Sequence, residues 1–245
     1  MKSTLLHIPH ASIHIPEQYI SSFSALKLEH ETALMTDWFC DELFDCGSDR
    51  IVFPISRLVC DVERFRDDRD EVMAKVGMGV TYTAASDLSK LRIVSEEERE
   101  TILEDYYDPH HLSFTQAVDQ RIDKYGKCLI IDCHSFYPAP LRYELSQNPV
   151  RPDFCLGTTE FHTPKAIANE ISGFLSKKGF SVSINKPFKG TIVPIKHYGI
   201  DNRVSSIMIE VNRKLYLESP GVKSQGFPYI KALIGKCVEI AETFG

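Results

Sequence analysis

Residues 128–135 read Cys-Leu-Ile-Ile-Asp-Cys-His-Ser, an apolar run that ends in a polar group. Such a run is typical of a central strand that is buried on both faces of a sheet. Residues 205–211, Ser-Ser-Ile-Met-Ile-Glu-Val, form a second run of this kind, and residues 5–9, Leu-Leu-His-Ile-Pro, form a shorter one. We therefore expect three buried strands, each with polar side chains at its carboxyl end.

Further strand and helix patterns alternate along the rest of the chain. Shorter strands are predicted at residues 50–54, 56–65 and 180–184. Helical spacing is present at residues 28–44, 109–125, 163–178 and 229–243, and another helix is predicted to begin after Ser95. This alternation predicts an α/β fold of one domain, residues 1–245, with a mostly parallel sheet covered by helices on both faces.

The composition of the chain argues against several classes of binding partner and metal site. The chain has a formal net charge of -6 and 43% hydrophobic residues, which argues against nucleic acid or an anionic membrane as the main partner. No apolar stretch has the length needed to span a bilayer, and the N-terminus does not resemble a signal peptide. The seven cysteines form no C-x-x-C pair, which disfavours a structural zinc ribbon. We expect a cytoplasmic protein with reduced thiols.

Three polar groups follow the predicted buried strands, and they are candidates for a catalytic site. They are His10 with Ser12, Asp132 with His134 and Ser135, and Glu210 with Asn212 and Arg213. Ligands bind beyond the carboxyl ends of strands in parallel sheets. Imidazoles and a carboxylate that converge there would suit an open catalytic zinc site. His134 has the strongest case, because Asp132 could orient its ring. His10 could equally be a loop histidine, and Glu210 is either a general base or part of a salt bridge.

Three arginines lie near these strand ends and bear on the substrate. Arg57, Arg64 and Arg213 could bind a carboxylate with paired N–H groups, although structural ion pairs are the alternative. An acidic substrate is therefore favoured. Cys133 could be a thiol nucleophile, but neighbours on a strand point to opposite faces, so a buried core thiol is the preferred interpretation.

The chain resembles the N-formylglutamate amidohydrolase family at several short motifs. In chain order they are Pro9-His10-Ala11-Ser12, Thr36-Asp37-Trp38, the segment from Ser56 to Arg64, Pro109-His110-His111, Asp132-Cys133-His134-Ser135 and Glu210-Val211-Asn212-Arg213-Lys214-Leu215-Tyr216. The resemblance covers residues 5 to 217. It implies a three-layer α/β sandwich like that of the zinc exopeptidases, with a central, mostly parallel mixed sheet, and hydrolysis of an N-acyl amino acid such as N-formyl-L-glutamate.

The resemblance also implies roles for individual residues. His10, Asp37 and His134 would bind one Zn²⁺ ion, and Glu210 would be the general base. Arg57, Arg64 and Arg213 would bind the substrate carboxylates. We assign Asn212, His111 and Ser135 as further substrate-binding residues. Glu63 stands where the family often has asparagine, which adds negative charge near the carboxylate site.

Other interpretations stay open on sequence alone. The enzyme could be an amidase or peptidase that acts on a small peptide or cell-wall fragment, or the chain could be a binding protein derived from this fold. A thiol hydrolase that uses Cys133 is a third alternative. Histidine and aspartate ligands also suit manganese, cobalt or iron. A homo-oligomer is compatible with the sequence, and residues 67–93 could form a lid.

Overall fold

The central strand of the fold is β3 (Cys128–Phe136), all nine residues of which are buried in the computed structural model, which describes residues 2–244. It pairs in parallel with β1 (Thr4–Ile8) on one side and with β6 (Val204–Asn212) on the other. These are the three apolar runs of the sequence. The most apolar strand lies in the middle because there both of its faces can be covered by other elements.

Three further strands complete a six-stranded sheet with the order β2-β1-β3-β6-β4-β5. Strand β2 (Asp49–Val52) adds in parallel to β1. Strand β4 (Phe154–Gly157) runs antiparallel to β6, and β5 (Val182–Ile184) is parallel to β4. The sheet is therefore mixed and mostly parallel. Strand β4 has only four residues, and the sequence did not predict it.

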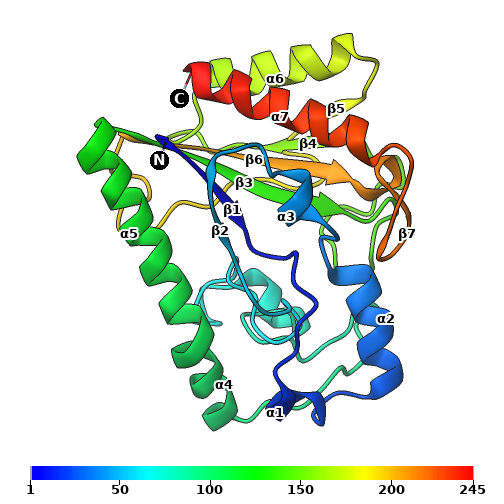
Figure 1. Ribbon diagram of the computed structural model, residues 1–245. Coiled ribbons are helices and arrows are strands. Elements are labelled where there is room, and N and C mark those ends of the chain that lie inside the picture. Colours follow the sequence, from blue (N-terminus) through cyan, green and yellow to red (C-terminus); the bar gives the residue numbers. More distant parts are fainter. Residues whose placement is uncertain (1, 245) are drawn as a thin grey trace.

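Helices cover both faces of the sheet (Figure 1). On one face, α3 (Cys40–Leu43), α6 (Lys165–Lys177) and α7 (Phe227–Phe244) pack on a core that includes Ile131 and Cys133. On the other face, α5 (Asp108–Tyr125) packs on a smaller core that includes Ile130. Alternate residues of β3 thus serve opposite cores, as the pleat requires. The predicted α/β class, a mostly parallel sheet flanked by helices, is confirmed.

A second part of the chain extends beyond the carboxyl ends of the strands. It contains α1 (Glu17–Ile20), α2 (Ala25–Met35), the short helix η1 (Val72–Val76), and α4 (Glu96–Ile102), which continues through a π-helical turn (η2, Leu103–Tyr107) into α5. It has its own apolar core, which includes Leu58, Val59, Cys60 and Tyr82. After β6 the chain forms η3 (Arg213–Leu215) and a hairpin of β7 (Leu217–Ser219) and β8 (Val222–Lys223).

Two predicted elements were wrong. Residues 56–65 form no strand: the backbone turns instead, with Val59 N–H donating to Ser56 O and Arg64 N–H to Asp61 O. Residues 28–44 are not one helix. Helix α2 ends at Met35, and Phe39 has a left-handed φ of 59° before α3 begins. In both cases tertiary contacts outweigh the local pattern.

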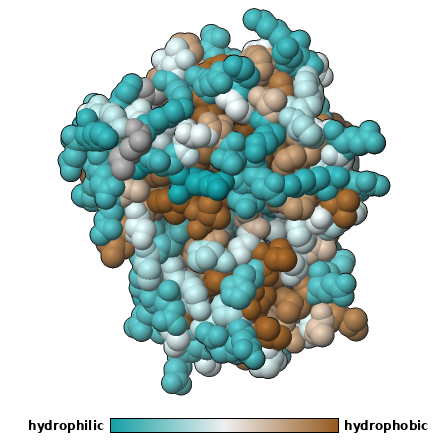
Figure 2. All heavy atoms as spheres, viewed as in Figure 1, coloured by the Kyte–Doolittle hydropathy of each residue, from teal (hydrophilic) through white to brown (hydrophobic). Residues whose placement is uncertain are grey.

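The face of the molecule shown in Figure 2 is mostly polar, and its apolar side chains gather in small groups rather than in one broad patch. Within residues 2–244, no helix combines the length and the apolar character needed to cross a bilayer.

Candidate active site

Three side chains meet at the carboxyl end of the central strands. His10 follows β1, His134 lies on β3, and Asp37 lies in the break between α2 and α3. The break is held by a backbone bond of 3.0 Å from Asp37 N–H to His10 O. All three residues are buried, with exposed fractions of 3%, 4% and 1% for His10, His134 and Asp37. The structure therefore brings together the three predicted metal ligands.

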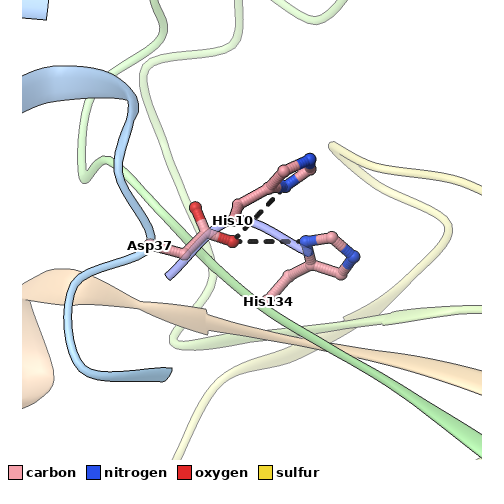
Figure 3. Close-up of side chains that lie close together, drawn as sticks. All are labelled: His10, Asp37 and His134. Atoms are coloured by element: carbon pink, nitrogen blue, oxygen red, sulfur yellow. Dashed lines mark hydrogen bonds and ion pairs between the residues drawn. The ribbon is translucent and has the colours of Figure 1, made fainter. Parts of the chain in front are cut away.

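The three side chains point their polar atoms at one place (Figure 3). Asp37 Oδ2 lies 3.2 Å from His134 Nδ1 and 3.8 Å from His10 Nδ1. One ligand atom from each residue lies within 4.8 Å of the other two. Two imidazoles and one carboxylate in this arrangement are a suitable donor set for a zinc ion with an open coordination position.

The outer nitrogen of each imidazole has a carboxylate partner. His10 Nε2 lies 2.8 Å from Asp61 Oδ1, and His134 Nε2 lies 3.0 Å from Asp132 Oδ1. Each Nε2–H can therefore donate to a carboxylate, which leaves the lone pair of Nδ1 directed toward Asp37. Carboxylates that orient metal-bound histidines in this way are common in metalloproteins.

This arrangement is unfavourable without a cation. Lone pairs of two nitrogens and a carboxylate oxygen would face one another, and His10 Nδ1 has no hydrogen-bond partner among residues 2–244. A proton on His134 Nδ1 can bond Asp37, but it leaves His10 Nδ1 unpaired. A buried polar atom without a partner costs free energy. The residues therefore fit a divalent metal ion bound by His10, Asp37 and His134.

The charges around the site favour the ligand forms of His10 and Asp37, whereas in the absence of a metal they favour a protonated His134. Burial and the positive charge of Arg57 lower the pKa of His10, which favours a neutral imidazole. Burial alone would raise the pKa of Asp37, but the hydrogen bond with His134 and the charge of Arg213 hold it below its usual range. Burial would lower the pKa of His134, yet the negative charges of Asp132 and Glu63 raise it well above its ordinary value. These acidic neighbours would equally stabilise a metal cation.

The site opens into a cavity of about 330 Å³, a size suited to a small molecule. Glu210 lies in its wall, in register with His134 on the neighbouring strand. Burial raises the pKa of Glu210 to about 8, and its Oε2 has no hydrogen-bond partner in the described part of the chain. A carboxyl group that titrates near neutrality is well placed to accept and return a proton.

The three predicted arginines all line the cavity, but they differ in what they contact. Arg57 donates from Nη2 to Asp61 at 2.8 Å and from Nε to the hydroxyl of Tyr82 at 3.2 Å. Arg64 Nε is buried, and within residues 2–244 it has no hydrogen-bond partner. The guanidinium group of Arg213 instead forms hydrogen bonds with other groups of the protein. It donates to Asp37 Oδ1, to the carbonyls of Leu34 and Ser135, and to Ser135 Oγ.

Two predicted substrate-binding residues do not reach the cavity. Asn212 has an exposed fraction of 0%, donates from Nδ2 to Pro152 O and accepts from Lys214 N–H. His111 Nε2 donates to Val62 O. Neither is among the cavity-lining residues, whereas Ser135 is. Residues 67–93 are packed into the second core through Met78, Val80 and Tyr82, and Met73 contributes to the cavity wall.

Asp61 was predicted only as a possible ion-pair partner of the arginines, and the structure adds it to the site. Asp61 is fully buried, and it contacts His10, Arg57 and the hydroxyl of Tyr82, which donates at 2.6 Å. Burial would raise its pKa, but the charges of Arg57 and His10 hold it well below its usual range. The signal was present: Asp61 follows the apolar run Leu58-Val59-Cys60, just as Asp132 follows Ile130-Ile131.

Comparison with known proteins identifies similar chains. The model of the N-formylglutamate amidohydrolase family matches residues 2–217. An N-formylglutamate deformylase of Pseudomonas putida is 26% identical over 227 residues, which cover 87% of this chain and 81% of the relative. The crystal structure of N-formylglutamate amidohydrolase from Ralstonia eutropha is similar with a TM-score of 0.85 and 20% identity, covering 99% of this chain and 94% of that one. A gene product of Agrobacterium tumefaciens has a TM-score of 0.69 and 18% identity, covering 97% of this chain and 91% of its own.

Proposed function

Since the chain belongs to the N-formylglutamate amidohydrolase family, an enzyme family, we propose that it hydrolyses the amide bond of an acidic N-acyl amino acid, N-formyl-L-glutamate first of all. The products are then formate and L-glutamate. One observation carries the proposal: His10, Asp37 and His134 converge at a cavity that Glu210, Arg57 and Arg64 also line.

We assign the three converging residues as ligands of one divalent metal ion, with zinc as the first choice. The donor set supports this, because zinc in hydrolases commonly takes three nitrogen or oxygen ligands and keeps one position open. When bound, the metal would supply Lewis acidity to the scissile carbonyl and to the attacking water. Asp61 and Asp132 hold the two imidazoles in the required orientation.

Glu210 is the proton carrier of the proposed reaction. Its carboxylate accepts a proton from the attacking water as the new C–O bond forms. It then returns this proton to the amide nitrogen as the C–N bond breaks, so that the amine leaves as a neutral group. The raised pKa of Glu210 supports both halves of this role, because such a group releases and binds a proton with little cost near neutral pH.

Arg57 and Arg64 are the substrate carboxylate binders of the proposal. Asp61 pairs with both of them, 2.8 Å from Arg57 Nη2 and 3.6 Å from Arg64 Nε. Arg64 Nε has no hydrogen-bond partner within residues 2–244, so its N–H can bond an incoming carboxylate. Guanidinium groups bind carboxylates with two parallel hydrogen bonds, which gives specificity for acidic substrates.

The test is metal content by mass spectrometry together with release of glutamate from N-formyl-L-glutamate before and after chelation. We expect about one zinc ion per chain and loss of turnover on chelation. The Glu210→Gln variant should keep the metal and lose about 10²- to 10⁴-fold in kcat. Turnover that survives complete metal removal would contradict the proposed metal dependence. Bound metal without turnover would contradict N-formyl-L-glutamate as the substrate.

The carboxylate site is tested by a matched pair of variants. Arg64→Met should raise KM for N-formyl-L-glutamate about 10- to 100-fold, because a charge-assisted bond to the substrate is lost. Arg66→Met removes an arginine two positions away whose side chain is 44% exposed and pairs with Asp108 and Glu100 on the surface. Equal KM values for the two variants would refute the assignment of Arg64.

A further inference from the structure

A chain of buried hydrogen bonds continues from the candidate metal site into the interior. Asp132 Oδ1 lies 3.0 Å from His134 Nε2 and 3.1 Å from His7 Nδ1. His7 Nε2 in turn lies 3.0 Å from His110 Nε2. The exposed fractions of His7 and Asp132 are 0%, and that of His110 is 7%. Water therefore has little access to these groups.

From this arrangement we propose that His7 and His110 are positioning residues, which act on the metal ligand His134 through Asp132. The inference rests on the proposed metal site. His7 pairs in register with Asp132 across the β1–β3 ladder, so both side chains lie on the same face of the sheet. Neither side chain is among the residues that line the cavity.

The hydrogen bonds of the chain require one set of tautomers. Asp132 is a carboxylate and can only accept, so His7 must donate from Nδ1. When His7 donates only from Nδ1, its Nε2 carries a lone pair, which accepts a hydrogen bond from Nε2–H of His110. Burial lowers the pKa of His110 to about 2, which agrees with a neutral ring. In this set of tautomers, Nδ1–H of His7 and Nε2–H of His134 both donate to Asp132. The lone pair of His134 Nδ1 is then available to bind a metal.

The surroundings hold these groups in place. Asp132 Oδ2 accepts the backbone N–H of Ile192 at 3.2 Å, so both carboxylate oxygens are bonded. The ring of His7 stacks on Phe114 of α5, with ring centroids 4.7 Å apart. The ring of His110 meets the edge of Phe53 at 5.1 Å. A carboxylate fixed in this way can orient the imidazole of His134 more tightly than a solvated one.

The same region admits one competing arrangement. His7 Nδ1 also lies 3.4 Å from Glu63 Oε1, and His7, Glu63 and Asp132 are close enough together to hold a metal ion of their own. A cation bound there would need the lone pair of His7 Nδ1 and would take an oxygen lone pair of Asp132 that His134 uses. In the hydrogen-bonded arrangement, His7 and His134 both stay bonded to Asp132, which favours this arrangement over a second metal ion.

Two substitutions of His7 test whether its hydrogen bond to Asp132 matters or whether the side chain only fills space. Asparagine places its amide nitrogen near the position of imidazole Nδ1, whereas glutamine places it near Nε2. His7→Asn should therefore keep the donor to Asp132, and His7→Gln should lose it. We expect the zinc affinity, measured by competition with a chelator, to fall about 10- to 100-fold in His7→Gln and clearly less in His7→Asn.

A matched control is His162→Asn. His162 is also buried and bonds Val204 O at 2.8 Å, at the opposite end of β6 from Glu210. It should lower stability without changing zinc affinity. Equal zinc affinities in wild type, His7→Asn and His7→Gln would overturn the proposal, and so would two zinc ions per wild-type chain.

The tautomers give a readout that needs no variant to fold. Nitrogen NMR shifts of ¹⁵N-histidine-labelled, metal-free protein should show His7 protonated at Nδ1 and His110 at Nε2. Protonation of His7 only at Nε2 would refute the proposed series of hydrogen bonds. This outcome is separate from failure of the proposed function, which would appear as wild-type protein that binds no metal or leaves N-formyl-L-glutamate intact.

Discussion

Arg213 Nη2 donates to Asp37 Oδ1 at 2.8 Å, while the other oxygen of Asp37 faces the two imidazoles of the candidate metal site. Arg213 follows β6 and Asp37 lies in the break after α2, so this bond joins parts of the chain 176 residues apart. One carboxylate oxygen is thus fixed by a guanidinium group. The other accepts the backbone N–H of Ser135 at 3.1 Å and keeps a lone pair directed at the imidazoles. Arg213 contributes to the shape of the site through Asp37.

We expect Arg213→Lys to weaken zinc binding about 10- to 100-fold, because an ammonium group cannot make the four bonds that Arg213 makes to Asp37, Ser135 and Leu34. Chelator competition measures the affinity, and steady-state kinetics at saturating zinc measure KM. A raised KM with unchanged zinc affinity would instead favour direct contact of Arg213 with the substrate. Arg66→Met is the control for the loss of a surface arginine.

Glu210 predicts a pH dependence of stability in the metal-free protein. Its pKa in the folded state is raised to about 8, whereas an unfolded glutamate titrates near about 4.3. Between these values the folded state binds more protons than the unfolded state, so this group makes stability fall as pH rises. Glu210→Gln should remove that contribution, about 1 to 3 kcal/mol between about pH 5.5 and about pH 7.5.

Urea unfolding of the metal-free wild type and Glu210→Gln at both pH values measures this difference. Titrating groups that do not interact with Glu210 contribute equally to the two proteins and cancel. Parallel pH curves for the two proteins would show that Glu210 is ionised in the folded state and would remove the support for its role as proton carrier.

Gly157 at the end of β4 is predicted to tolerate no side chain. A Cβ there would lie 2.1 Å from Gly190 O and 2.4 Å from Met208 Cε. Gly157→Ala should therefore lower the free energy of unfolding by about 3 kcal/mol. The control is Gly173→Ala in α6, where a Cβ meets nothing within 4 Å and should stabilise the helix by about 0.5 to 1 kcal/mol. Thermal or urea unfolding of both variants checks the pair, and a neutral Gly157→Ala would contradict the packing described.

Alkylation and substitution of Cys133 test the alternative that the enzyme is a thiol hydrolase. It has an exposed fraction of 0%, it lies in the core on the α7 side of the sheet, and burial raises the pKa of its thiol well above the ordinary value. We expect iodoacetamide to leave activity unchanged, and Cys133→Ala to retain activity while losing about 1 kcal/mol of stability. Loss of turnover in that variant with the metal still bound would revive a nucleophilic role.

Sequence alone determined the features that depend on local pattern. The apolar runs at residues 5–9, 128–135 and 205–211 became the three central strands. Strand alternation placed Asp132 and His134 on one face and Cys133 on the other, because successive side chains of a strand point in opposite directions. The polar residues after these runs meet because parallel strands end at the same edge of the sheet.

Only the tertiary structure decided the features that depend on distant contacts. Helical spacing placed Asp37 within a helix, but its backbone bond to His10 and its ion pair with Arg213 hold it in a break between two helices. Similarly, the sequence indicated Asp61 only as a possible ion-pair partner of nearby arginines. Burial beside His10, Arg57 and Tyr82 makes it part of the site. Except for Arg57, these partners lie more than 20 residues away in the chain, and a carboxylate is buried only where such partners bond it.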